Sequence, residues 1–247
     1  MAIVRSSMFN LFKDKIQALP SPLSEEDLRS QDFLLDQDER NRLEIFYAPF
    51  EYINTEAKIL IAGITPGMHQ MQVAFQTVWD LQNESLTDEE ILREVKKRSS
   101  FEGTMRKNLV AMLDELGLNE QLGIRSTIEL FGEANGLVQT SSILPHAVFF
   151  AGKNYNGSRP DPLKTELLRT YIETYFAKDH AMLKSPLIIP LGVNVSRVIE
   201  ELVKDGWQDD SHVLKTFPHP SGSNGHRHRQ FAENKEKMRQ DLARFFN

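Results

Sequence analysis

Two short apolar segments constrain the fold of this chain more than any other feature. Residues 58–63 read KILIAG and residues 186–192 read PLIIPLG. Apolar runs of this length, bounded by turn residues, are typical of strands that are buried on both faces of a parallel sheet. Both runs are far shorter than the roughly 20 apolar residues that cross a bilayer. The sequence therefore predicts a parallel α/β core and no membrane-spanning segment.

Helical patterns separate and follow these strands. Thr87 precedes Glu90 by the spacing of a capping box, and an amphipathic stretch that begins near Met105 stops at Gly117. Strands that alternate with helices predict a three-layer α/β/α sandwich with a central four-stranded, mostly parallel sheet. Further helices are expected at residues 161–177, 195–205 and from about 230 onward, further strands at residues 136–144 and 213–217, and a long irregular loop at residues 145–162.

The N-terminal part of the chain has a different pattern. Phe9, Phe12 and Ile16 recur at helical spacing, and Ser24 with Asp27 has the pattern of a capping box. We therefore expect residues 1–57 to form a helical extension packed on the rest of the chain. No repeat or linker-like stretch divides the sequence, so residues 1–247 are expected to form a single domain.

Composition excludes several classes of chemistry. The chain has no cysteine, which excludes disulfides, thiolate catalysis and cysteine-held metal clusters. Its formal net charge of −6 argues against a general electrostatic affinity for nucleic acid but leaves room for a local basic patch. The first residues lack the apolar stretch of a secretory signal. We expect a monomeric protein of the cytoplasm, or of the nucleus in a eukaryote, that uses no metal and no organic cofactor.

Two loops stand out as carriers of chemistry. Residues 63–69 (GITPGMH) follow the first apolar strand, and residues 217–227 (FPHPSGSNGHR) follow the last predicted strand. Loops that leave the carboxyl ends of parallel strands form the ligand crevice of such sheets. Each loop alone has an ordinary structural interpretation, since Gly and Pro mark turns and a single loop histidine is common. Together they suggest a binding site.

The two loops resemble those of the uracil-DNA glycosylase superfamily, in which a G-x-x-P-[GY] loop and an H-P-S loop face each other across the base pocket. The segment PLIIPLGVNVSRVIEEL is similar to that superfamily's third strand and the helix after it. The resemblance is strongest to the single-strand-selective monofunctional branch of this superfamily. Three segments are similar to that branch in order and spacing: YAPFEYI, GITPGMHQM and HPSGSNGHRHRQFAENKEKM. The resemblance runs from Tyr47 to the C-terminus, and the absence of cysteine excludes the cluster-bearing thermostable branches.

The resemblance implies a DNA glycosylase that flips a damaged nucleotide out of the stack and hydrolyses its glycosidic bond. It implies that His219 donates a hydrogen bond to a uracil carbonyl and stabilises the charge on the departing base. Thr65 stands where the family usually has the Asp or Asn that orients the attacking water. A hydroxyl can hold a water but cannot act as a base at neutral pH, so we expect slow catalysis.

The resemblance also implies a base pocket, from which this sequence departs at one point. The superfamily's base-reading asparagine is replaced by hydroxyl side chains at residues 140–142, and Asn154 or Asn156 in the following loop are alternative sources of an amide. An aromatic residue after the first loop should stack on the base, and Phe75 is favoured over Trp79, although such a pair also has ordinary core spacing. The predicted base-binding residues are Gly63, Ile64, Pro66, Gly67, Met68, Phe75 and Ser142.

DNA is the partner that this resemblance implies. Residues 223–239 carry five basic and two acidic side chains in an otherwise acidic chain. Loop amides and the start of the last helix favour phosphate binding there, although a solvated helix face explains the charges from Lys235 onward equally well. The predicted DNA-backbone contacts are Ser221, Gly222, Ser223, Asn224, Arg227 and Arg229.

Other functions stay open. A nucleic-acid or nucleotide-binding protein with the same fold and little or no glycosylase activity is the main alternative, because of Thr65 and the missing asparagine. An unrelated α/β hydrolase is disfavoured because the sequence has no G-x-S-x-G elbow. His226 and His228 near His219 suggest a metal site, but their spacing supplies no third ligand. His69 is a further candidate for the pocket.

Overall fold

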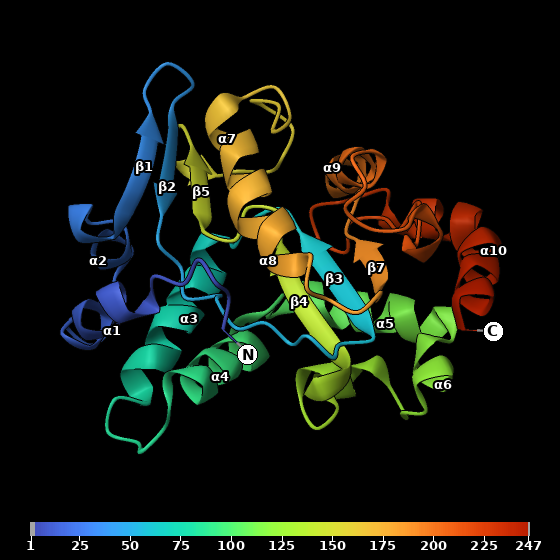
Figure 1. The fold of residues 1–247 in the computed structure, drawn as a ribbon, viewed down its shortest axis with the longest axis horizontal. Coiled ribbons are helices and arrows are strands. Elements are labelled where there is room, and N and C mark those ends of the chain that lie inside the picture. Colours follow the sequence, from blue (N-terminus) through green and yellow to red (C-terminus); the bar gives the residue numbers. More distant parts are fainter. Residues whose placement is uncertain (1–2, 247) are drawn as a thin grey trace. The chain divides into compact units, whose positions relative to one another are not determined.

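Two separate sheets organise the structure, a computed structural model that describes residues 3–246 (Figure 1). One sheet has four strands in the order β1-β2-β5-β6, and the other has three strands in the order β4-β3-β7. The chain divides into two compact units, the first containing residues up to 53, 64–100 and 142–180, and the second residues 54–63, 101–141 and from 181 onward. The expectation of one domain stays a prediction.

The first unit combines the four-stranded sheet with helices. Its sheet is antiparallel, with β2 paired to both β1 and β5 and with β6 at the edge. The strands are β1 (Leu34–Asp38), β2 (Leu43–Phe46), β5 (Ala147–Phe150) and β6 (Lys153–Asn154). The helices are α1 (Phe9–Gln17), α2 (Glu25–Leu28), the 3₁₀ turn η1 (Gln31–Phe33), α3 (Met68–Asp80), α4 (Asp88–Ser99), α7 (Glu166–Tyr171), the π-helical η4 (Ile172–Ala177) and α8 (Lys178–His180).

This sheet corrects two predictions. Residues 1–57 are helical only in their first half, because the mostly buried residues 43–46 form β2, which pairs across a hairpin with β1. The predicted loop at residues 145–162 contains β5, a four-residue apolar strand that pairs with β2. Both errors have the same physical reason. These strands are specified by partners that are distant in sequence. The local composition, which is acidic around the first strand and rich in Gly, Asn and Pro around the second, indicated no strand.

The predicted helix signals of the first unit are confirmed at α2 and α4. The Ser24 hydroxyl and the Asp27 carboxylate form a reciprocal capping box, and Thr87 with Glu90 forms a second one. α3 and α4 lie side by side (Figure 1). The buried face of α3 packs its Phe75 ring edge-on against Phe33, with ring centroids 4.9 Å apart.

The second unit contains the parallel sheet. Ile59 lies opposite Leu187 and Ala62 opposite Pro190, so β3 and β7 run in the same direction with their carboxyl ends together. The strands are β3 (Ile59–Gly63), β4 (Val138–Ser142, of which Ser142 counts with the first unit) and β7 (Leu187–Pro190). The helices are α5 (Thr104–Leu116), α6 (Leu118–Leu122), α9 (Val193–Lys204) and α10 (Arg227–Phe246), with 3₁₀ turns η2 (Thr127–Phe131), η3 (Asn135–Leu137) and η5 (Asp210–His212).

The predicted central four-stranded, mostly parallel sheet is therefore wrong in its strand count, while the mixed α/β class is confirmed. Residues 213–217, expected as the fourth strand, make only a single parallel bridge from Val213 to Ile188. The strand ends there because Thr216 adopts a left-handed backbone with φ 66° and Pro218 follows it. The predicted helices at α5 and α10 are confirmed, with Gly117 in the left-handed conformation that ends α5.

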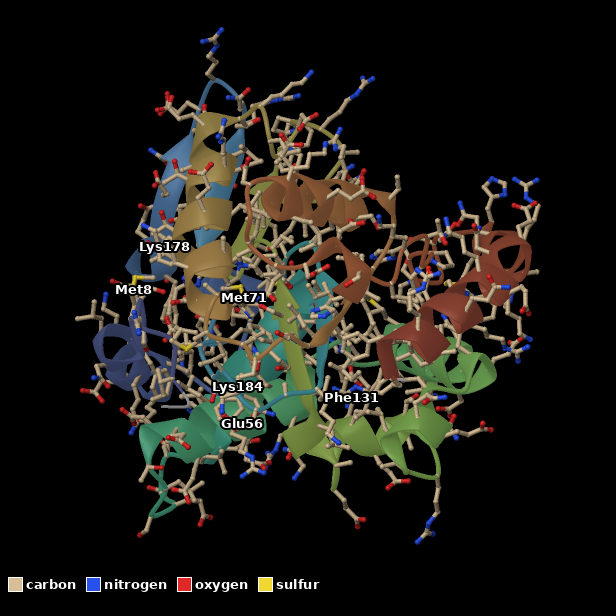
Figure 2. The ribbon with its side chains drawn as sticks, turned by 45° about the vertical axis from the view of Figure 1, so that its right-hand side comes forward. Met8, Glu56, Met71, Phe131, Lys178 and Lys184 are labelled. Carbon is tan, nitrogen blue, oxygen red and sulfur yellow. The ribbon has the colours of Figure 1, made fainter. Side chains whose placement is uncertain are left out.

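An ion pair joins two segments of the second unit that are distant in sequence. Lys184 and Glu56 lie side by side (Figure 2), with 2.7 Å between Nζ and Oε1. Both side chains are mostly exposed, so the pair contributes little to stability.

Among residues 3–246, no helix is long and apolar enough to cross a membrane.

A buried charge marks the first unit. Lys96 on α4 is only 7% exposed, and burial lowers its pKa to about 7, against an opposing attraction from Asp179. Asp179 on α8 accepts a hydrogen bond from the Ser6 hydroxyl at 2.6 Å, and its own pKa is raised by burial. A lysine in such a place loses its proton far more easily than in the unfolded chain.

Lys96→Met should flatten the rise of the unfolding free energy between about pH 7 and pH 9. The unfolded chain keeps this lysine protonated up to about pH 10.4, whereas the folded chain releases the proton above about pH 7. The unfolded state therefore binds more protons in this window, and stability rises with pH by up to about 1.4 kcal/mol per pH unit. Urea unfolding at several pH values measures the slope.

Lys97→Met is the matched control, because the Lys97 side chain is 38% exposed and its Nζ lies 3.2 Å from Glu94. This variant should keep the wild-type dependence on pH. Parallel profiles for the wild type and Lys96→Met would contradict the prediction.

Candidate functional site

The first loop connects β3 to α3 and is held at both ends by backbone hydrogen bonds. Gly67 caps α3 without a side chain of its own, and its N–H donates to the Gln70 side chain at 3.2 Å. The Ile64 carbonyl accepts from the Leu144 N–H at 2.9 Å, which ties the loop to the segment after β4. Ile64 and Met68, two predicted base-binding residues, are each only 9% exposed. They contribute packing to the loop more than accessible surface.

The Thr65 hydroxyl is engaged within the protein. Its Oγ1 donates to the His146 carbonyl at 2.7 Å and accepts from the Val148 N–H at 3.0 Å. A hydroxyl has one proton to donate and two lone pairs. Thr65 therefore keeps one lone pair that can accept a hydrogen bond from a water, and it has no proton left to donate to that water. Its two hydrogen bonds connect the first loop to His146 and to β5.

His146, whose carbonyl accepts the hydrogen bond of the Thr65 hydroxyl, was missed by the sequence reasoning. It is 2% exposed, and burial lowers its pKa to about 4, so it is neutral at physiological pH. Its Nδ1 accepts from the Ala48 N–H at 3.4 Å, and its ring packs with those of Tyr47 and Tyr175. A Pro-His pair before an apolar run gave no sequence signal for this role.

Asn154, an alternative amide in the prediction, lies on β6, and its side chain contacts the end of the first loop. Its Oδ1 accepts the Met68 N–H at 3.0 Å, at the first turn of α3. Its Nδ2 lies 3.4 Å from the position that a Cβ on Gly67 would take. Asn156 does different work, because its Oδ1 accepts from both the N–H and the hydroxyl of Ser158 and so holds the local turn.

The predicted stacking aromatic is corrected by the structure. Phe75 is fully buried and packs against Phe33, so it presents no face to a ligand. Trp79 donates its indole N–H to the Leu19 carbonyl at 3.2 Å. Phe75 therefore belongs to the buried core of the first unit, and the half-buried Trp79 contacts the segment that follows α1. Ser142, at the end of β4, is half-buried.

The second loop packs closely on the carboxyl end of β7. The Gly192 N–H donates to the Phe217 carbonyl at 3.0 Å. A Cβ on Gly192 would lie only 2.8 Å from the His219 Cβ, and Gly192 has φ 86°. Only glycine meets both demands, since its missing side chain permits the contact and the positive φ. Gly192 thus sets the position of His219, a role that sequence reasoning missed.

The protonation state of His219 follows from its contacts. Its Nδ1 accepts the Ser221 N–H at 3.2 Å. Since Nδ1 is an acceptor, the neutral ring carries its proton on Nε2. Burial lowers the pKa of His219, which favours that neutral form at pH 7. The half-buried imidazole therefore offers one N–H donor, and it has no need of a positive charge to do so.

Two of the residues predicted to touch DNA form hydrogen bonds within the second loop, and their DNA contacts stay a prediction. The Asn224 Nδ2 donates to the His219 carbonyl at 3.1 Å, and the Arg227 guanidinium donates to the Ser221 carbonyl at 2.7 Å. Asn108 on α5, which sequence reasoning missed, donates to the Pro220 carbonyl at 2.8 Å. The loop is therefore braced at three successive carbonyl groups around His219. Arg229 stays mostly exposed, 3.7 Å from Glu233.

Thr65 belongs to the first unit and His219 to the second. The expectation that their loops face one pocket stays a prediction. The first loop follows Gly63 at the end of β3, and the second loop packs against Gly192, which comes after β7, the parallel partner of β3. Among residues 3–246, no three His, Asp or Glu side chains come together as a metal-binding group, and this includes the region of His226 and His228.

Known proteins share this sequence pattern. The model of the uracil DNA glycosylase superfamily matches residues 50–243. The chain is 38% identical over 245 residues to the uncharacterized protein YoxB of Bacillus subtilis (strain 168). The alignment covers 98% of this chain and 95% of the relative. No solved structure gives a significant match. The family match spans both loops and well over half of the sequence. The chain therefore belongs to the uracil DNA glycosylase superfamily.

Proposed function

We propose that this protein is a monofunctional DNA glycosylase that hydrolyses the N-glycosidic bond of uracil or a related deaminated or modified base. The observation that carries the proposal is His219, a neutral imidazole whose only proton is on Nε2. Membership in the superfamily supports the reaction class. Within it, the sequence of the two loops supports the single-strand-selective monofunctional branch.

In the proposed reaction, the bond between C1′ of the deoxyribose and the base nitrogen breaks, and the base leaves with the bonding electron pair. The oxygen of water adds to C1′, and the water loses a proton to solvent or to the departing base, so the products are a free base and an abasic site. The His219 Nε2–H stabilises the negative charge on the base oxygen as the bond breaks. A fixed donor of this kind contributes about 2.7–4 kcal/mol.

No charged base acts from Thr65. Its hydroxyl donates its one hydrogen bond to the His146 carbonyl, so its remaining lone pair can accept a hydrogen bond from a water without deprotonating that water. The barrier is then lowered chiefly by leaving-group stabilisation and by the reactivity of the oxocarbenium-like sugar. We therefore propose a slow enzyme.

Binding of the DNA backbone is proposed for the exposed part of the second loop and the start of α10. Ser223 and Arg229 are exposed there, and phosphates favour such loops at helix N-termini. Arg227 and Asn224 act by fixing the loop conformation. Ser223 and Asn224 are small and polar, so this loop inserts weakly into a duplex, which favours single-stranded DNA.

The second candidate function is binding without turnover. The double engagement of the Thr65 hydroxyl favours it, because the position usually occupied by the water-orienting carboxylate or amide does structural work here. A binder shows salt-dependent affinity for DNA and yields no abasic product.

His219→Ala should lower the rate of abasic-site formation on a uracil-containing single strand about 100- to 1000-fold, because the leaving group loses its donor. DNA affinity should change little, since phosphate contacts dominate binding. Single-turnover rates, read by alkaline cleavage of the abasic product, measure the effect. His226→Ala is the control on the exposed part of the same loop. Absence of product from wild-type protein on uracil, hypoxanthine, xanthine and hydroxymethyluracil would refute the enzymatic proposal.

Gly192→Ala should displace His219 and lower the rate even where the protein stays folded. The new Cβ would meet the His219 Cβ at 2.8 Å, so the loop must shift. Gly206→Ala is the matched control, because Gly206 has nearly the same φ of 85° but nothing within 4 Å of its added Cβ. We expect the unfolding free energy to fall by roughly 1–3 kcal/mol more in Gly192→Ala than in Gly206→Ala, together with a specific loss of activity. Equal effects of the two substitutions would argue against this packing role.

A further inference from the structure

The peptide group between Pro220 and Ser221 is hydrogen-bonded at both of its polar atoms. Its carbonyl oxygen, on Pro220, accepts from the Asn108 Nδ2 at 2.8 Å. Its N–H, on Ser221, donates to the His219 Nδ1 at 3.2 Å. A peptide group is planar, so the two hydrogen bonds share one rigid unit. The Asn108 amide and the His219 imidazole are therefore linked through a single peptide group.

The Pro220 carbonyl needs a partner inside the protein. Pro220 is buried, and a buried carbonyl group that stays unpaired costs free energy. Asn108 supplies a donor from 112 positions away in the sequence. Only the nitrogen of a side-chain amide can donate to a carbonyl, so this contact also sets the orientation of the Asn108 amide.

Packing fixes the place of Asn108 on α5. The next residue, Leu109, is fully buried in a core cluster that also contains Phe217, two residues before His219. Thr104, one helical turn before Asn108, has its Cγ2 3.9 Å from the position that a Cβ on Gly222 would take. The helix therefore lies against the second loop, and the amide is carried by a rigid element.

This link decides what the His219 ring offers to a substrate. The Ser221 N–H makes Nδ1 an acceptor, so the neutral ring carries its proton on Nε2. A donor at the carbonyl of the same peptide strengthens that N–H as a donor, because hydrogen bonds in series polarise one another. Asn224 and Arg227 bind the carbonyl groups of neighbouring peptides. Of the three side chains that hold this loop, Asn108 is the one that acts on the peptide facing the ring.

Resting on the proposed function, we propose that Asn108 is a positioning residue, which fixes the orientation and the proton position of the His219 imidazole through the peptide between Pro220 and Ser221. Asn108 itself touches neither the base nor the sugar. It keeps Nδ1 engaged as an acceptor, so that the Nε2–H is held in place for the leaving group. A donor that is already in place needs no reorganisation as the glycosidic bond breaks.

NMR of the imidazole nitrogens tests this link without turnover. The protein is labelled with ¹⁵N-histidine and measured at about pH 8, where histidine is neutral, and the spectrum of His219→Ala assigns the His219 signals. Asn108→Leu removes the donor at similar volume. Its Nδ1 signal should move toward that of an unbonded nitrogen, and a second species with the proton on Nδ1 should appear. The single-turnover rate of abasic-site formation should fall about 10-fold, the effect of weakening one hydrogen bond.

Asn234→Leu is the matched control, because Asn234 also donates its Nδ2 to a backbone carbonyl at 2.8 Å, that of Gln230 on α10. This variant should keep the wild-type signals and rate. Thermal melting verifies folding, and Asn108→Asp, which has the same shape and no donor at this pH, decides the question if Asn108→Leu does not fold.

A wild-type Nδ1 signal in a folded Asn108 variant, or a shifted signal with a wild-type rate, would overturn the proposal. If the wild type itself yields no abasic product, the glycosylase activity is refuted, and the Nδ1 signal still decides whether Asn108 sets the imidazole. The two proposals therefore fail by different measurements.

Discussion

The parallel pairing of β3 with β7 is the constraint on which the organisation of both candidate loops depends. All the residues of these strands are buried, and their register brings Gly63 and Gly192 to the same edge of the sheet. Chain that leaves this edge must turn sharply, and a glycine ends β3 while another stands two residues after the end of β7. At Gly192 the requirement is most severe, because the His219 Cβ occupies the space of a side chain. The position of the imidazole is therefore a consequence of how closely a loop can approach the end of a buried strand.

Polar side chains around both loops are used mainly to fix backbone. Thr65 fastens the first loop to β5, and Asn108, Asn224 and Arg227 hold the carbonyl groups around His219. Such supporting contacts hold the reacting groups in place, and catalysis by a neutral donor needs this kind of rigid placement. The same arrangement explains why few charged groups are needed in the proposed reaction. The cost is chemical, since a threonine committed to structure activates water poorly.

Sequence reasoning succeeded where the signal is local. The capping boxes at Ser24 and Thr87, the stop at Gly117 and the buried runs at residues 58–63 and 186–192 were all found from spacing and residue type. It failed for β5 and for Phe75. The strand has only four residues and depends on β2 some hundred positions earlier. The aromatic ring has the spacing of a core residue, and its burial against Phe33 is decided by the N-terminal helices.

The amino-acid sequence by itself determined the family and the two loops and pointed to His219 as the proposed donor, because these depend on short motifs whose residues are neighbours in the chain. Only the tertiary structure decided the hydrogen-bonding state of those residues. The partner of Thr65 is 81 positions away and that of Asn154 is 86 positions away. A hydroxyl or an amide looks free in a sequence, and whether it still has a proton or a lone pair for a ligand depends on which distant backbone group folding brings within 3 Å of it.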